Sequence, residues 1–362
     1  MPVHFSQERM AQAVEAHTRW WAGTLDRPLT SVIITDAYPT EKRTPAPVLS
    51  QKSCAQLEWT AEQVIEATDE ALSRNEYLGD SYPMVNLDSF GPGVLAALCD
   101  GAKLDNSSGG VWFFPAEEKE LCDIHVRYNP ENLWARRIKD LYRAGRQFWG
   151  DSVVMSMPDL GGVMDVLASL RGSENLLMDL YDCPEEVKRI AGEVEIAWQD
   201  AYADFRQAMG DGALYTDWNG ILSTQPSYIL QCDFSYMISN AMFREFVLET
   251  LRRDTERLAN TIYHLDGVGE LNHLDDLCSL ERLRAVQWVF GEGKPGPMHW
   301  LDVYRRIMKA GKQVMIVGEA KDYPDTLHAL GGTPYARYFL PASDRALAEA
   351  VIHARTHYTP LQ

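Results

Sequence analysis

Short apolar runs alternate with longer segments of helical period along most of the chain, and this alternation limits the possible folds more than any other feature. Most of the runs are nearly continuously apolar, which is typical of parallel strands buried on both faces. We predict strands at 31–35, 84–87, 111–114, 152–157, 213–216, 261–264, 285–290, 313–317 and 337–340. A further short apolar stretch, 228–230, precedes Gln231 and Cys232.

The segments between these runs carry signals for helix ends. Pro184 suits the first turn of one helix, where its missing N–H would have no partner. Ser239 is a candidate N-cap for another helix, and Gly311 is placed to end a helix over 300–310. Residues 6–25 form a further helical segment near the N-terminus.

Repeated strand-then-helix units imply parallel strands joined by right-handed crossovers. An open doubly wound sheet and a closed barrel both satisfy this pattern, but the number of units and the lack of a dinucleotide-binding fingerprint favour the barrel. No Pro/Ser-rich linker divides the 362 residues. We therefore expect an α/β protein: an N-terminal helical segment over 1–30 that flanks a (β/α)₈ TIM-type barrel over 31–362.

The charge and cysteine content argue against several classes of protein. The chain has 34 Lys and Arg against 52 Asp and Glu, a net charge of −18, and such a field repels nucleic acid and anionic lipid surfaces. The sequence contains neither the apolar core of a signal peptide nor an apolar run long enough to span a membrane. Its six cysteines are scattered, which favours reduced thiols. We expect a cytoplasmic enzyme for a small molecule, without nucleic-acid or membrane partners.

Polar residues at the strand ends are the candidates for a functional site, because barrel active sites lie at the carboxyl ends of the strands. Acidic side chains recur there beside one histidine and one cysteine: Asp88, Asp159, Asp217 with Trp218, Gln231 to Asp233, His264, Asp266, Gln287 with Trp288, and Glu319. Crowded carboxylates are costly unless they are paired, protonated or bound to a cation. The set indicates a metal, a cationic substrate group or acid/base chemistry, with Asp159 and Asp217 positioning substrate or donating protons.

His264 and Asp266 are the most specific pair in this set. Residues two apart at a strand end point the same way, so both side chains can face one ligand. Cys232 and Glu319 also offer zinc-compatible groups at predicted strand ends. Three readings stay open on this pattern: a metal site, a catalytic or substrate role without metal, and a structural role in which Asp266 orients His264.

Aromatic side chains are frequent near the predicted strands and their ends. Such residues are individually more often part of a core, but together they are compatible with a large, flat, apolar ligand. The candidate cofactor-binding residues are Trp218, Phe234, Tyr236 and Trp288.

Several motifs, in this order along the chain, resemble the uroporphyrinogen decarboxylase superfamily. They are FGPGVLAALCDG, MPDLGGVMDVLASLRG, LQCDFSYMIS, YHLDGVGELNHLDDL and VQWVFGEGKPGPMHWLDVYRRIMKAGK. The similarity runs from about Trp59 to the C-terminus. It implies a TIM-type barrel, which agrees with the alternation of strands and helices.

The chain resembles one branch of this superfamily more than the other. True uroporphyrinogen decarboxylases open with an arginine-rich segment that holds the substrate carboxylates, and QERMAQAVEAHTRWWAG lacks it. The methylcobamide:coenzyme M type methyltransferases bind zinc through a His-x-Cys pair and a later cysteine. His264 matches that histidine, Asp266 occupies the cysteine position, and no cysteine follows Cys278. The resemblance therefore implies a modified zinc site of His264 and Asp266, with Glu319 and Cys232 as further ligands.

The resemblance implies a corrinoid-dependent methyltransferase. Such an enzyme moves a methyl group between a corrinoid on a separate protein and a small acceptor, with assistance from zinc, and barrels of this class often form homodimers. Two alternatives stay open. One is a uroporphyrinogen decarboxylase-type carboxy-lyase that uses carboxylates as acid and base without metal. The other is a non-catalytic corrinoid- or tetrapyrrole-binding protein.

Overall fold

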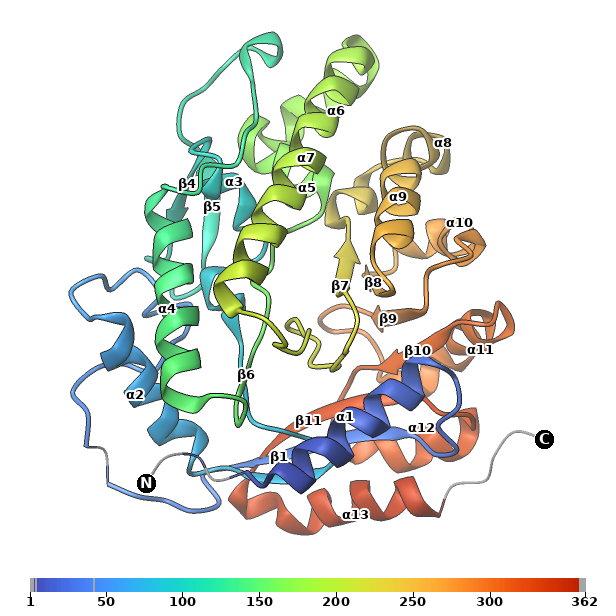
Figure 1. Ribbon diagram of the computed structural model, residues 1–362. Helices are drawn as coiled ribbons and strands as arrows, with labels where there is room; N and C mark the ends of the chain where they lie inside the picture. The colour runs from blue at the N-terminus through green and yellow to red at the C-terminus, as the bar shows by residue number, and fades with distance from the viewer. Residues whose placement is uncertain (1–2, 4, 42, 358–362) are drawn as a thin grey trace.

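The computed structural model describes residues 3, 5–41 and 43–357, so residues 358–362 of the predicted barrel lie outside the described part. The protein is an α/β protein in which helices surround a largely parallel sheet (Figure 1). The strands of this sheet are β1 (Leu29–Thr35), β2 (Glu76–Gly79), β7 (Ser227–Gln231), β8 (Asn260–Asp266), β9 (Ala285–Val289), β10 (Gln313–Ile316) and β11 (Tyr335–Pro341). Their hydrogen-bonded order is β2-β1-β11-β10-β9-β8-β7, and only β2 runs antiparallel to its neighbour.

The register of the strands decides which side chains share a face of the sheet. Gln231, His264, Gln287, Met315 and Tyr335 are partners in turn across β7, β8, β9, β10 and β11. Because register partners point to the same side of a sheet, these five side chains form a row on one face. The row is continuous across the strands that carry most of the predicted site.

The helix α1 (Gln7–Trp21) covers the same face near the amino ends of the strands. Its residues Trp20 and Trp21 are buried in an apolar cluster with residues of β1 and of β7 to β11. The Trp20 Nε1–H donates to the carbonyl of Thr333 at 2.8 Å, and the Trp21 Nε1–H donates to the carbonyl of Leu222 at 2.9 Å. The predicted N-terminal helix is therefore packed onto the sheet, and the carboxyl ends of the strands stay free for a site.

The backbone ladders of the described chain do not form a closed barrel. The strands β3 (Met84–Val85) and β6 (Val154–Met155) pair only with each other. The run predicted as a strand at 213–216 forms none, because Tyr215 makes an isolated antiparallel bridge with Ser223 instead. The sequence prediction of eight continuous parallel strands was therefore too regular in this half of the chain.

Two side chains form hydrogen bonds where the ladders are interrupted. The Ser81 hydroxyl, just before β3, donates to the carbonyl of Val32 in β1 at 3.1 Å. On the other side, the Asp217 carboxylate accepts from the Ile229 N–H in β7 at 2.8 Å. Side-chain hydrogen bonds thus connect the segment before β3 to β1, and the loop that contains Asp217 to β7.

Two other strand predictions differ from the structure. The run at 111–114 is β5 (Trp112–Pro115), which forms an antiparallel hairpin with β4 (Ala102–Asp105) outside the main sheet. Its Trp112 and Phe114 side chains are exposed, so the apolar run is not a buried strand. Conversely, the stretch 228–230, which the sequence marked only as apolar, is the core of β7.

The helix-end signals in the sequence are confirmed. Pro184 is the first residue of α7 (Pro184–Met209), and Gly311 lies just after α11 (Leu301–Lys309). At the start of α8 (Asn240–Phe243), the Ser239 hydroxyl accepts from the Met242 N–H at 3.3 Å. The remaining α-helices are α2 (Ala61–Leu72), α3 (Leu95–Leu98), α4 (Leu133–Trp149), α5 (Val163–Arg171), α6 (Ser173–Asp182), α9 (Glu249–Arg257), α10 (Leu274–Ser279), α12 (Tyr323–Leu330) and α13 (Arg345–Thr356). None of the helices in the described part of the chain is both long and apolar enough to cross a bilayer.

Candidate functional site

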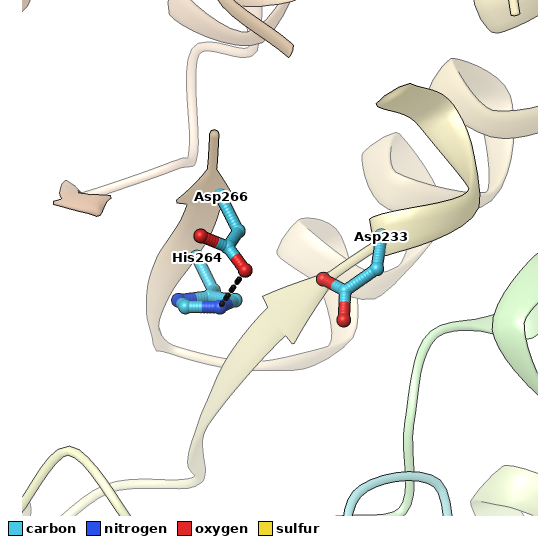
Figure 2. A group of neighbouring side chains, drawn as sticks. All are labelled: Asp233, His264 and Asp266. Carbon is cyan, nitrogen blue, oxygen red and sulfur yellow. Dashed lines mark ion pairs between the residues drawn. The ribbon is translucent and has the colours of Figure 1, made fainter. Parts of the chain in front are cut away.

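A histidine and two carboxylates meet at the carboxyl ends of β7 and β8. His264 and Asp266 lie on β8, and Asp233 begins the short 3₁₀ helix that directly follows β7 (Figure 2). One ligand atom from each residue lies within 4.8 Å of the others, and His264 Nε2 is 3.9 Å from Asp266 Oδ2. Asp233 is exposed while the other two are half-buried. The group therefore has the residue types and the spacing of a metal site that solvent can reach.

Gln287 fixes the orientation of the His264 ring. Its Oε1 lies 2.5 Å from His264 Nδ1, and its Nε2 donates to the Met315 sulfur at 3.2 Å. Because the amide nitrogen faces the sulfur, the amide oxygen faces the ring and accepts the Nδ1–H. A neutral imidazole bonded in this way carries its lone pair on Nε2, the atom that faces Asp266. The histidine is thus oriented as metal-binding histidines usually are, with the second nitrogen held by a hydrogen bond.

Two further acidic side chains hold the backbone beside the two carboxylates. Glu270 accepts from the Asp266 N–H at 3.0 Å, and Asp165 accepts from the Phe234 N–H, next to Asp233, at 2.7 Å. Burial raises the pKa of Glu270 to about 9. Burial, and then the Asp233 charge, raises the pKa of Asp165 to about 7. A largely protonated Glu270 adds little negative charge behind the site at neutral pH, so it supports Asp266 without repelling it.

Asp159 lies next to this group but does not belong to it. Its Oδ1 accepts from the Gly161 N–H at 2.8 Å and from Nε2 of Gln231, the strand neighbour of His264, at 3.3 Å. Burial, and then the nearby Asp88 carboxylate, raises the pKa of Asp159 well above its ordinary value. This shift favours the protonated form of Asp159, whose carboxyl group is separated from His264 by the Gln231 side chain.

Asp217 has a structural position at the edge of β7. Its two oxygens accept from the Asn219 N–H at 3.0 Å and the Ile229 N–H at 2.8 Å. Burial raises its pKa to about 7. The following residue, Trp218, brings its ring edge-to-face against the His264 ring, with 4.9 Å between centroids. Asp217 thus positions Trp218 at the site, and it holds a proton that titrates near neutral pH.

Two predicted metal ligands are not brought to the group. Cys232 follows Gln231, so the two-residue period of the strand turns its side chain away from His264, and it lines a small cavity against α7 and α9 instead. Burial raises the pKa of its thiol well above the ordinary value. Glu319 is exposed and forms an ion pair with Lys321 at 2.5 Å. Within the described residues, only Asp233, His264 and Asp266 form a cluster of this kind.

The four predicted aromatic residues lie in different places. Trp218 contacts His264, and Tyr236 is exposed against the glycine-containing loop that follows Asp266. Phe234 is buried in the wall of a cleft of about 350 Å³ beside Asp233. Trp288 is fully buried and, as the neighbour of Gln287 in β9, points to the opposite face of the sheet. The first three adjoin the site, and Trp288 does not.

Sequence reasoning named Asp233 and Gln287 only as strand-end residues and assigned neither a role, and it missed Asp165 and Glu270. Asp233 and Gln287 carry a usable signal, because Gln287 lies within β9 and Asp233 follows β7, the two strands that pair with β8. Asp165 and Glu270 lie several residues beyond their strand ends, in α5 and in a short 3₁₀ helix at Glu270–His273. Their place behind the site follows only from how these segments fold back.

Comparison with known proteins shows a similarity to solved structures. No family model matches the sequence, and no curated protein matches it. The structure resembles a methyltransferase from Methanosarcina mazei, with a TM-score of 0.57 over 88% of this chain and 94% of that chain. The two chains share a fold. Their sequence identity is 12%, so the similarity concerns the fold alone.

Proposed function

We propose that this protein is a methyltransferase that moves a methyl group between a corrinoid on a separate protein and a small acceptor. The observation that carries the proposal is the His264 ring, which Gln287 holds with Nε2 facing two carboxylates at the ends of adjacent parallel strands. The fold shared with a methyltransferase supports the reaction class. The sequence motifs support membership of the uroporphyrinogen decarboxylase superfamily, and with it a distorted TIM-type barrel.

The residues at the site fit a divalent metal ion, and we propose zinc. One imidazole and two carboxylates are ligands that zinc accepts, and three protein ligands leave a position open for substrate. The set we propose is His264, Asp266 and Asp233, which replaces the Cys232 and Glu319 expected from the sequence. When bound, zinc holds an acceptor thiol as thiolate at neutral pH, which makes it nucleophilic.

The other side chains supply orientation and protons. Gln287 keeps His264 in the tautomer that presents Nε2, and Glu270 holds the backbone of Asp266. Burial raises the pKa values of Asp159 and Asp217, and we propose that these carboxyl groups position substrate or donate a proton. Preset positions of this kind lower the entropy cost of bringing reactants together.

The surroundings of the site suit a large flat co-substrate. Trp218 and Tyr236 flank the His264–Asp266 pair, and Phe234 lines the adjoining cleft. We propose that the corrinoid approaches over these aromatic side chains. The acidic charge and scattered cysteines further support a cytoplasmic protein without nucleic-acid or membrane partners, and we propose that it forms a homodimer.

A carboxy-lyase is the second candidate function. The observation in its favour is that burial raises the pKa values of two buried carboxyl groups, Asp159 and Asp217. Such groups suit proton transfer without a metal. This candidate predicts loss of carbon dioxide from a carboxylate substrate by the metal-free protein.

Metal content is the first test. We expect about one zinc per chain in the wild-type protein by elemental analysis, after purification without chelator and addition of zinc. His264→Ala and Asp233→Ala should each lose most of the metal. Glu319→Ala is the matched control, because it removes a carboxylate that the sequence predicted as a ligand and the structure places in an exposed ion pair; it should keep the metal.

Methyl transfer is measured next, from methylcobalamin to a small thiol such as 2-mercaptoethanol. Wild type and Glu319→Ala should transfer the methyl group, and His264→Ala should not. A protein that binds no zinc after add-back, or a Glu319→Ala variant that loses zinc as His264→Ala does, would rule out the proposed site. Metal-free decarboxylation would then favour the lyase.

A further inference from the structure

Arg337 lies on the same face of the sheet as the candidate site. In β11 it stands two residues beyond Tyr335, which belongs to the row that contains His264 and Gln287. Because side chains two apart on a strand share a face, the Arg337 side chain projects to the side where His264 lies. It is half-buried there.

The Arg337 guanidinium forms no ion pair within the described chain, although its charge acts on the buried Asp217 carboxyl, whose oxygens accept backbone N–H bonds. The contacts of the guanidinium are a long hydrogen bond of 3.5 Å from Nη1 to the Trp218 carbonyl and the ring of Phe339, whose centroid is 4.8 Å away. No Asp or Glu of the described residues comes within ion-pair distance of it. A half-buried guanidinium without a carboxylate is costly, since such charges are normally paired. An anionic ligand would supply such a partner.

A purely structural role for Arg337 is already filled by other groups. The nearby carbonyl of Gly220 accepts hydrogen bonds from the hydroxyls of Tyr82 and Tyr335, at 3.1 Å and 3.2 Å. The Asn219 carbonyl also accepts from Tyr335 at 3.2 Å. The loop therefore has several hydrogen bonds besides the long one from Arg337.

The backbone beside Arg337 leaves room for a flat guanidinium. Gly220 has φ +79°, and a Cβ at this position would lie 2.3 Å from Arg337 Nη1. Any other residue would both strain the backbone and displace the guanidinium. The loop is thus shaped around the position that Arg337 occupies.

Trp218 connects Arg337 to the candidate metal site. Its carbonyl meets Arg337, its ring packs edge-to-face against His264, and its Nε1–H is buried without a hydrogen-bond partner. A buried N–H of this kind needs an acceptor. Trp218 therefore brings an unpartnered N–H donor beside His264, and the carbonyl of the same residue contacts the Arg337 guanidinium.

We propose that Arg337 binds the carboxylate of the small substrate, with the Trp218 Nε1–H as a second donor. A guanidinium can grip a carboxylate through two parallel hydrogen bonds. One local cation inside a molecule of net charge −18 suits a single carboxylate rather than a polyanion. Which reaction this substrate undergoes rests on the proposed function, but its carboxylate binding does not.

The test uses propionate and its neutral analogue propionamide as probes of metal-free, full-length protein, titrated by ligand-observed NMR. We expect propionate to bind about tenfold more tightly than propionamide, and Arg337→Met to remove that difference. Arg337→Lys should lose part of it, because an ammonium lacks the planar pair of donors. The matched control, Arg305→Met, removes an exposed arginine and should leave propionate binding unchanged.

Equal binding of the two probes by the wild-type protein, or full propionate affinity in Arg337→Met, would overturn the proposal. If circular dichroism and gel filtration show that Arg337→Met does not fold, Arg337→Lys decides, and full propionate affinity in that variant overturns it. Zinc content is measured in parallel on the wild type. Absent zinc with intact propionate selectivity would refute the proposed metal site alone, and bound zinc without selectivity would refute the role of Arg337 alone.

Discussion

The hydrogen bond between Gln287 and His264 offers the sharpest test of the candidate site. Gln287→Met keeps an unbranched side chain of similar length in a buried position, and it removes the amide oxygen that lies 2.5 Å from His264 Nδ1. His264 then has no acceptor for the Nδ1–H in the tautomer that presents Nε2 to a metal. The variant should therefore weaken metal binding without removing any ligand.

The size of this effect follows from the burial of the bond. Leaving a buried N–H without an acceptor costs about 1–3 kcal/mol, which corresponds to roughly 5- to 150-fold in an equilibrium constant. Loss of a hydrogen bond behind a metal ligand lowers metal affinity by about 10- to 100-fold in other proteins. The two ranges agree, and we expect zinc affinity to fall by about 10- to 100-fold in Gln287→Met.

The assay is competition for zinc against a chromophoric chelator, with wild type, Gln287→Met and Gln287→Glu compared under the same conditions. Gln287→Glu is the matched control, because a carboxylate still accepts the Nδ1–H, and its zinc affinity should stay within about threefold of wild type. Unchanged zinc affinity in Gln287→Met would refute the orienting role of Gln287. Equal losses in both variants would indicate that the position matters for packing rather than for the hydrogen bond.

Two further predictions concern stability. Gly162→Ala should destabilise the fold by about 1–3 kcal/mol in chemical denaturation, because the new Cβ would lie 2.1 Å from the Gln231 carbonyl oxygen. The control is Gly192→Ala in α7, where the new Cβ meets no other atom, and it should stabilise the fold by about 0.5–1 kcal/mol. Similar effects of the two substitutions on stability would contradict the close contact at Gly162. Burial raises the pKa of Asp217 to about 7, so between about pH 4 and pH 7 the folded protein keeps a proton on Asp217 that the unfolded chain has lost. The free energy of unfolding should therefore fall as the pH rises through this range, by up to about 4 kcal/mol from this group. Asp217→Asn removes this contribution, and a pH dependence of unfolding as steep as in wild type would show that Asp217 does not titrate in that range.

The sequence determined the local elements and part of the site. The alternation of apolar runs with helical segments predicted an α/β protein, and the signals at Pro184, Ser239 and Gly311 predicted helix ends that the structure confirms. These features depend on neighbouring residues, so one sequence is enough to read them. The proximity of His264 and Asp266 can also be predicted from neighbouring residues, because side chains two apart on a strand share a face.

Tertiary structure decided which other residues join His264. Asp233 and Gln287 reach it through the pairing of β8 with its two neighbours, and a shift of one residue in that register would turn both away. The same dependence on register explains why Cys232 does not join the site: it is one residue from Gln231, so its side chain points to the opposite face. Arg337 meets Trp218 only because β11 and the loop at 218–220 pack together across the sheet. Contacts between distant segments depend on register and packing, which no local pattern in the chain contains.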